Sequence, residues 1–210
     1  MAMTDGAGPG PEYEISLIQP SDFQNTASML ADAFSDKQGR WCCALICSRS
    51  ETINEQMRAF QIYQQQNPAK LQHIAVIRDA DGSILGYCAL QMQGDLGNCT
   101  MPESTRHTLQ PGEVHLEQIG VSEQARGRGI GKKLMAWAHT TARDAGATFI
   151  SLEVISVNRA KRLYEREGYV VTPNPEGDGC ITWCFSCSFI WCCMGCRYTA
   201  VDYMVKQLKD

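Results

Sequence analysis

The chain has 210 residues, of which 44% are hydrophobic and 20% are charged, and its formal net charge at pH 7 is -4. This composition excludes a disordered or collagen-like chain and predicts one soluble globular domain, long enough to bury a core. Because 19 Lys and Arg face 23 Asp and Glu and form no basic run, it also argues against nucleic acid or an anionic membrane as the main partner.

Cysteine is unusually frequent, with 11 residues of this type. The amino terminus lacks the basic and apolar regions of a signal peptide, so we expect a reducing, cytoplasmic environment rather than a disulfide framework. In that environment most thiols act as small hydrophobic side chains. Residues 1–12 contain three glycines and two prolines, which predicts a tail before a single domain over 13–210.

In chain order, a strand over 13–18 is followed by two expected helices. Ser21 and Gln24 have the spacing of a capping box, and so do Ser48 and Glu51. Each helix has an apolar stripe with a period close to 3.6 residues. The stripes consist of Phe23, Ala27, Leu30 and Phe34 in the first helix, and of Ile53, Met57, Phe60 and Tyr63 in the second, which ends at Asn67-Pro68.

The remaining elements alternate between strands and helices. A hairpin is expected over 73–78 and 84–92, then a polar loop over 93–112 and a strand over 113–121, where Gly120 predicts a bulge or a close backbone approach. Helices over 130–145 and 158–167 and strands over 149–155, 169–172 and 198–205 complete the chain. Strands alternating with helices indicate an α/β or α+β sheet.

The most informative segment is the turn Arg126-Gly127-Arg128-Gly129-Ile130-Gly131-Lys132. Its alternate glycines let the backbone approach a bulky anion, and the helix that follows adds free amides and partial positive charge. Arg126, Arg128 and Lys132 add cations, so the turn predicts a phosphate or pyrophosphate ligand. A Walker A loop is excluded because Lys133 replaces the required Ser or Thr, and a dinucleotide fingerprint because Lys132 replaces its third glycine.

The remaining pattern, Arg-x-x-Gly-x-Gly after a strand that ends at Val121, resembles the GNAT superfamily of acetyl-coenzyme A (acetyl-CoA)-dependent N-acetyltransferases. The segment from Asn158 to Tyr169 is similar to a second motif of that family, Asn…Ala-x-x-Leu-Tyr-x-x-x-Gly-Phe. The resemblance covers residues 113–169. It implies an α/β (α+β) GNAT fold, with a central mixed, mostly antiparallel sheet and about four flanking helices.

The resemblance also implies where acetyl-CoA is held. The main chain of the strand, including Ile119 and Val121, would pair with pantetheine. The turn would hold the pyrophosphate through Arg126, Gly127, Arg128, Gly129, Ile130, Gly131 and Lys132. Asn158 is a further expected cofactor contact, although it precedes Ala160 by two residues where many members have three, so Val157 is the alternative.

Acetyl transfer to an amine needs a proton acceptor, a donor to the developing oxyanion, and an acid for the departing thiolate. From the resemblance, Glu117 is the expected base, with His115 as its partner, because period-two alternation places both side chains on one face of the strand. An ordinary salt bridge or a merely hydrogen-bonded histidine is the alternative. Tyr164 resembles the family's general acid, and the alternative is a tyrosine that only packs in the core. Glu153 resembles a base found in part of the family, but a simple charge at the strand edge is the favoured interpretation.

A cysteine-rich, aromatic insertion is expected over 175–197, before the last strand, with Cys180, Cys184, Cys187, Cys192, Cys193 and Cys196. The alternating aromatic residues favour a packed strand or an interface, while two C-x-x-C pairs leave zinc open. Acylated cysteines contacting a membrane are a further alternative. We assign no residue as a metal ligand on this pattern.

The leading function is therefore an N-acetyltransferase that uses acetyl-CoA to acetylate a primary amine by direct attack. The expected acceptor is a small-molecule amine or a protein amine, bound by the first two helices and the loop over 93–112. A non-catalytic acyl-CoA-binding module and a zinc-dependent interaction protein are the alternatives. Nothing in the sequence selects the amine or the oligomeric state.

Overall fold

The computed structural model describes residues 13–34, 48–101, 103, 106–156, 158–175 and 201–208. These residues form a sheet with the strand order β1-β2-β3-β4-β5-β7-β6. All neighbouring strands are antiparallel except β4 and β5, which are parallel. The expected mixed, mostly antiparallel sheet is confirmed. The strands are β1 (Ile15–Leu17), β2 (Ile74–Arg78), β3 (Ile84–Gln91), β4 (Glu113–Val121), β5 (Phe149–Ile155), β6 (Val170–Thr172) and β7 (Val201–Gln207).

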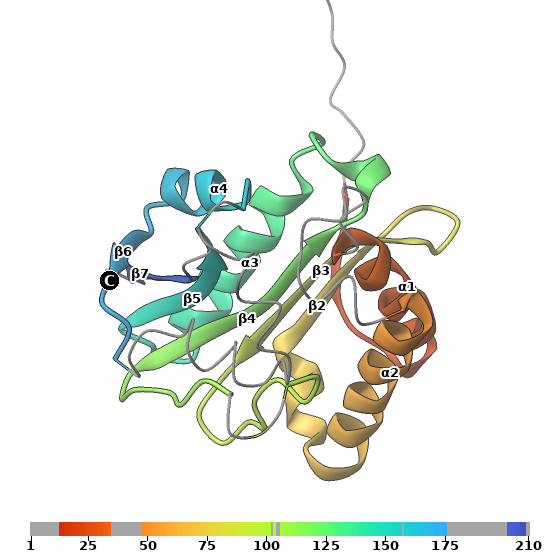
Figure 1. The fold of residues 1–210 in the computed structure, drawn as a ribbon, viewed down its shortest axis with the longest axis horizontal. Helices are drawn as coiled ribbons and strands as arrows, with labels where there is room; N and C mark the ends of the chain where they lie inside the picture. The colour runs from red at the N-terminus through yellow and green to blue at the C-terminus, as the bar shows by residue number, and fades with distance from the viewer. Residues whose placement is uncertain are drawn as a thin grey trace, which may run out of the picture.

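Helices cover both faces of the sheet (Figure 1). One face packs against α1 and α2, and the other against α3 and α4. The α-helices of the described residues are α1 (Phe23–Phe34), α2 (Arg49–Gln66), α3 (Ile130–Asp144) and α4 (Lys161–Arg166). Short 3-10 helices are η1 (Pro20–Asp22), η2 (Pro68–His73) and η4 (Glu123–Ala125).

The two expected capping boxes have different outcomes. At α2 the Ser48 side chain accepts from the Glu51 amide at 3.3 Å, and the Glu51 carboxylate accepts from the Ser48 amide at 2.6 Å, so this box is confirmed. The box assigned to Ser21 and Gln24 is wrong, because η1 precedes α1 and Asp22 instead accepts from the Gln19 amide at 2.7 Å.

The glycines of β3 and β4 set how closely the helices approach the sheet. A Cβ at Gly86 would lie 2.7 Å from Ile130 of α3, and one at Gly120 would lie 3.0 Å from Leu30 of α1. The close approach predicted at Gly120 is therefore confirmed. The bulge lies elsewhere, at Glu117, where the register against β3 shifts between Ala89 and Leu90.

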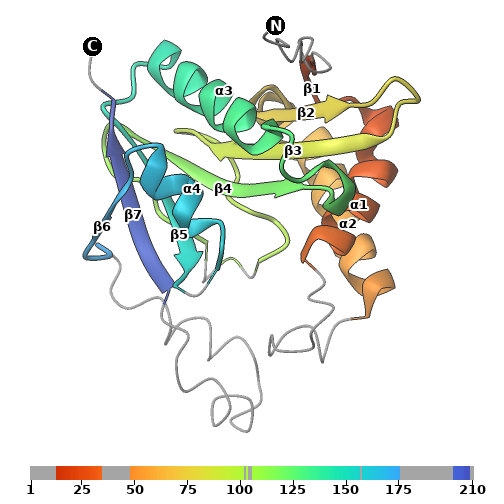
Figure 2. The same cartoon turned by 90° about the horizontal axis from the view of Figure 1, so that it is seen from above.

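The parallel strands β4 and β5 separate halfway along β4. Their pairing runs from Glu113 opposite Phe149 to Leu116 opposite Leu152 and goes no further. Beyond that point β5 stays paired with β7, while β4 stays paired with β3. Figure 2 shows the two strands diverging. Among the described residues, 117–121 of β4 thus have a strand partner on one side only.

Several expectations concern residues outside the described ones. The tail over 1–12 and the cysteine-rich insertion from Cys180 to Cys196 both belong to this group. Of the described cysteines, Cys88 and Cys99 have free thiols, and Cys88 is buried. Within the described parts of the chain, no helix has both the length and the apolar composition needed to cross a bilayer.

Candidate active site

The turn that leads into α3 has the backbone shape its glycines predict. Gly127 and Gly129 have φ angles of 79° and 80°, in the left-handed region that disfavours other residues. A Cβ at either position would contact nothing within 4 Å, so glycine is needed there for its conformation and not for space. Gly129 is the N-cap of α3, and the first amides of a helix have no partner within the helix.

Three cations surround this helix terminus, as predicted. Arg126 donates to the Ala33 carbonyl at 3.4 Å, and Arg128 donates to the Tyr13 hydroxyl at 3.5 Å. Both guanidinium groups are exposed, and so is Lys132. Because exposed amides, a helix terminus and loosely held cations coincide, the turn can bind a pyrophosphate.

The unpaired edge of β4 adjoins that turn. It includes Ile119 and Val121, and Gly131 at the start of α3 lies against Val121 and Leu163 of α4. A strand edge presents backbone donors and acceptors that an extended ligand can pair with. The edge and the turn are continuous, so one ligand with an extended amide arm and a pyrophosphate can occupy both.

Glu117 lies at the bulge of β4 and forms a buried ion pair with Lys70 of η2. The Lys70 ammonium donates to Glu117 Oε2 at 2.7 Å, and Glu117 Oε1 is buried without a hydrogen-bond partner among the described residues. Burial raises the pKa of Glu117, and the charge and hydrogen bond of Lys70 oppose that rise. One carboxylate oxygen is thus held and the other is available.

Lys70 is 0% exposed, which is exceptional for a lysine. Its ammonium also donates to the Leu90 carbonyl at 2.7 Å, and it lies 3.9 Å from Asp95 and 5.7 Å from the ring centre of Tyr63. These contacts compensate the buried charge and fix the ammonium against Glu117.

His115 lies on the same face of β4 as Glu117. Val114 and Leu116, which alternate with these residues, point to the opposite face and pack into the core beneath α3. No hydrogen bond joins His115 to Glu117, however. The Nδ1 atom of His115 instead lies 2.7 Å from Ser151 Oγ of β5, and its ring stacks on that of His107 with centres 4.1 Å apart. Burial is the main cause of a pKa for His115 well below 6.5.

Glu113 anchors this group of side chains. Its Oε1 atom accepts from His107 at 2.8 Å, from Tyr203 at 3.0 Å and from Ser151, and its Oε2 atom accepts from the Gln110 amide at 2.6 Å. Burial raises the pKa of Glu113, but these hydrogen bonds, with that of His107 first, outweigh it and lower the pKa to about 2.

His107, Glu113 and His115 also place three ligand atoms within 4.8 Å of one another, a donor set that zinc accepts. Three donors already point at Glu113 Oε1, which leaves that oxygen no lone pair for a cation. The hydrogen bonds account for the positions of these three side chains without an ion.

Tyr164 and Asn158 come from the α4 segment. Tyr164 is buried in the core with Tyr169, at a ring separation of 6.0 Å, and burial raises its pKa. It thus approaches from the α3 side of the sheet, whereas Glu117 faces α1 and α2. Asn158 is exposed, and its Oδ1 atom accepts from the Ala160 amide at 2.9 Å.

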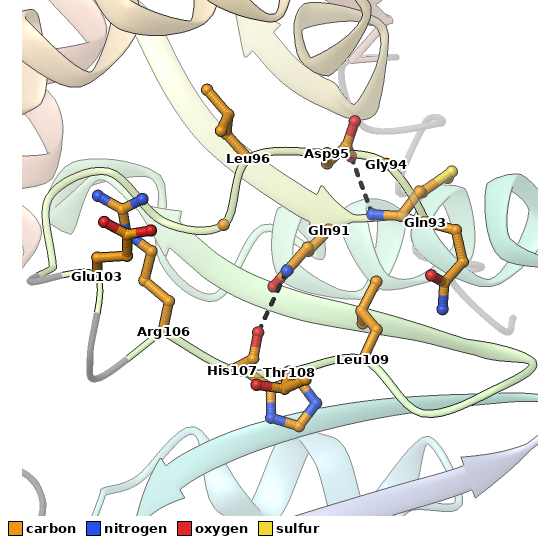
Figure 3. A pocket seen from close by; sticks show the side chains of 12 residues that line it. Gln91, Gln93, Gly94, Asp95, Leu96, Glu103, Arg106, His107, Thr108 and Leu109 are labelled. Atoms are coloured by element: carbon orange, nitrogen blue, oxygen red, sulfur yellow. Dashed lines mark hydrogen bonds between the residues drawn. The ribbon is translucent and has the colours of Figure 1, made fainter.

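A pocket of about 360 Å³ opens at the carboxyl end of β3 (Figure 3). It is bounded by residues 91–97 on one side and by Glu103 and residues 106–109 on the other. Gln91 bridges the two sides by donating to the His107 carbonyl at 3.2 Å, and the Tyr63 hydroxyl of α2 accepts from the Cys99 amide at 2.9 Å. Residues of the expected polar loop over 93–112 line much of this pocket, whereas no residue of α1 or α2 is part of its lining.

Sequence reasoning missed the residues that surround the candidate base and histidine. Lys70 and Asp95 lie in a short turn and a polar loop, and Ser151 and Glu113 have no motif of their own. The segment after Pro68 has no clear hydrophobic periodicity, so nothing in the neighbouring sequence indicates that Lys70 is buried. The period of two in β4 is the one signal that could have found Glu113, because it puts that residue on the same face as His115.

Comparisons with known proteins agree with this geometry. The model of the acetyltransferase (GNAT) family matches residues 40–169. An aminoalkylphosphonate N-acetyltransferase of Salmonella typhimurium is 36% identical over 90 residues, which are 42% of this chain and 51% of that protein. The chain thus spans about half the length of this curated relative.

Solved structures share the fold at low sequence identity. An N-acetyltransferase from Staphylococcus aureus Mu50 has a TM-score of 0.59 at 15% identity, over 95% of this chain and 100% of that one. The acetyltransferase yncA of Salmonella typhimurium, solved with its cofactor acetyl-CoA, has a TM-score of 0.57 at 15% identity, over 95% and 96% of the two chains. The PaiA N-acetyltransferase of Thermoplasma acidophilum, in complex with coenzyme A, has a TM-score of 0.56 at 14% identity, over 94% of this chain and 99% of that one.

Proposed function

The chain belongs to the acetyltransferase (GNAT) family, and we propose that it transfers the acetyl group of acetyl-CoA directly to a primary amine. The observation that most supports this is the edge of β4 without a strand partner among the described residues. It runs from a buried carboxylate, one oxygen of which has no hydrogen-bond partner among those residues, to a positively charged glycine turn. A thioester held along that edge would present its acetyl end near Glu117.

Acetyl-CoA supplies the activated acetyl group, and the chain has groups that fit its parts. The β4 main chain, including Ile119 and Val121, is available for the pantetheine amides. The turn from Arg126 to Lys132 offers helix amides and three cations for the pyrophosphate. Asn158 is exposed at the start of α4 and is the remaining proposed contact.

Glu117 is the proposed base. A primary ammonium must lose a proton before it can attack, and Glu117 Oε1 is a buried acceptor with no competing partner among the described residues. Burial raises the pKa of this carboxyl, which makes its anion a better proton acceptor. The Lys70 ammonium fixes the other oxygen and favours the ionised form.

Tyr164 is the proposed acid for the coenzyme A thiolate. Its raised pKa keeps the phenol protonated at neutral pH, so the phenol can donate a hydrogen bond or transfer a proton. The acceptor would enter from the pocket beside β3, whose volume of about 360 Å³ suits a small-molecule amine. A protein amine is the second candidate.

The experiment is to supply the full chain with acetyl-CoA and a panel of amines, including aminoalkylphosphonates, polyamines, arylalkylamines, amino acids and peptides. Thiol release and the mass of the acetylated product are measured together. We expect amine-dependent thiol release matched by product. Binding of acetyl-CoA without turnover on any amine would favour the alternative, a non-catalytic acyl-CoA-binding module.

A further inference from the structure

We propose that Ser151 and Glu113 are positioning residues that hold His115 with its proton on Nδ1, so that Nε2 receives the acceptor's proton after Glu117. This inference rests on the proposed function and deepens it. It assigns roles to a buried cluster that joins β4, β5 and β7 and lies outside the family motifs.

The hydrogen bonds define the tautomer. Ser151 has one hydroxyl hydrogen, and it donates that hydrogen to Glu113, whose carboxylate can only accept. Toward His115, Ser151 Oγ can then only accept, so the Nδ1 atom 2.7 Å away must carry the hydrogen. A neutral imidazole with a proton on Nδ1 has its lone pair on Nε2.

Glu113 is suited to hold this arrangement. Hydrogen bonds from His107, Tyr203, Ser151 and the Gln110 amide fix both of its oxygens, and its pKa of about 2 keeps it ionised. Its Oε1 atom lies 4.0 Å from His115 Nδ1. A permanent negative charge at that distance stabilises the imidazolium that forms when Nε2 takes a proton.

Other charges near His115 oppose its protonation. His107 stacks on the ring and Lys70 lies on the same side of the sheet, and both lower the pKa of His115, as burial does more strongly. Glu113 is the group that raises it. The histidine therefore rests neutral and becomes charged only while a proton passes through it.

The acceptor ammonium gives one proton to Glu117 Oε1. Glu117 passes this proton through a water molecule to Nε2 of His115, which lies two residues away on the same face of β4. As the C–N bond forms and the C–S bond breaks, Tyr164 gives its proton to the thiolate, and the second proton of the nitrogen restores the phenol. The products are the amide, the free thiol and one proton, which His115 returns to water.

The first test is the tautomer itself, read by nitrogen-15 NMR of the full chain labelled at histidine. The chain has only four histidines, so His115 can be assigned by comparison with His115→Gln. We expect a neutral ring with Nδ1 protonated at pH 7. A ring protonated on Nε2 would overturn the proposal, whether or not the amine panel reveals an activity. Zinc bound at one per chain, with histidine shifts that respond to a chelator, would also overturn it.

The second test is the Ser151→Ala variant, with Thr26→Val as the matched loss of a buried hydroxyl on α1. With an amine that the wild type acetylates, we expect Ser151→Ala to lower kcat at least about tenfold and to alter its pH profile. Ser151→Ala should not change the KM for acetyl-CoA. Thr26→Val should change neither kcat, nor its pH profile, nor that KM. The Glu113→Gln variant, similar in shape, should reproduce the kinetic change. A folded Ser151→Ala protein with wild-type kcat and pH profile would refute the positioning role.

Discussion

Glu117 and Lys70 form a buried pair in which Lys70 holds one carboxylate oxygen, while the other is buried without a hydrogen-bond partner among the described residues. The pair favours the ionised carboxylate, while burial favours the neutral acid. The balance suits a group that must take a proton from an ammonium at neutral pH.

The Glu117→Gln variant should lower kcat about 100-fold near neutral pH, because the amide cannot accept the proton. The loss should shrink at higher pH, where solvent deprotonates more of the amine. Rates measured from pH 6 to pH 10 check this, with acetyl-CoA affinity as the control for binding. A variant with a wild-type profile would remove Glu117 from the role of base.

The Lys70→Met variant should lower the free energy of unfolding by about 3 kcal/mol at pH 7, because it leaves the Glu117 charge buried and unpaired. The cost should be smaller at acid pH, where Glu117 becomes protonated. Urea unfolding at two pH values measures it. The double variant Lys70→Met/Glu117→Gln should regain most of the loss, and a double variant as unstable as Lys70→Met would argue against the pairing.

The sequence predicted the identity of the candidate base but not its surroundings. The resemblance placed Glu117 and His115 two residues apart on one strand, and the structure confirms that they share a face. Lys70 and Ser151 reach them only because η2 and β5 fold against β4. Contacts of this kind depend on tertiary packing, which local periodicity does not encode.

At the scale of elements, α3 is fixed at its amino end by contacts with two neighbours. A Cβ at Gly86 of β3 would lie 2.7 Å from Ile130, and one at Gly131 would lie 3.2 Å from Leu163 of α4. These close approaches position the helix terminus at the end of β4. The proposed pyrophosphate site therefore depends on helix packing as well as on the turn.

The Gly129→Ala variant should weaken acetyl-CoA binding at least about tenfold and cost about 1 kcal/mol of stability, because alanine strains a turn with φ of 80°. Gly146→Ala is its matched control at the other end of α3. Its φ is 75° and a Cβ there also meets nothing, so it should cost similar stability without affecting binding. Calorimetric titration and thermal melts separate the two effects. Equal losses of affinity in both variants would mean that the turn has no direct role in binding.

Elements with strong local signals were predicted closely. The β4 strand has the bounds that alternation gave, and the Ser48 box begins α2 at Arg49. The Ser21 box was wrong because the cap contact lies two residues earlier, where Asp22 accepts from the Gln19 amide. Phe34 was assigned to the apolar stripe of α1 but is 50% exposed at the end of that helix. Helix ends depend on what packs beyond them, which the period does not reveal.

At the scale of the whole molecule, the separation of β4 from β5 is the feature that no local pattern predicts. It arises where β5 continues with β7 and β4 continues with β3. The buried hydrogen bonds of Glu113 link β4, β5 and β7 on the paired side of that separation. They should therefore stabilise the sheet as well as orient His115.

This contribution should depend on pH. Glu113 has a pKa of about 2 in the fold against 4.5 as the reference value, so its stabilisation, about 3 kcal/mol, is present above pH 4.5 and is lost as the pH falls toward 2. The difference in unfolding free energy between the wild type and Glu113→Gln should shrink over that range. Denaturant melts at pH 7, 4 and 3 measure it. A difference that stays constant with pH would show that the carboxylate is not held as described.

In the proposed reaction the acetyl group passes from acetyl-CoA directly to the amine while both are bound. Initial rates measured over a grid of acetyl-CoA and amine concentrations distinguish this route from a covalent one through any of the chain's 11 cysteines. Direct attack predicts double-reciprocal lines that intersect. Parallel lines, together with an acetylated protein detected by mass spectrometry before amine is added, would contradict it.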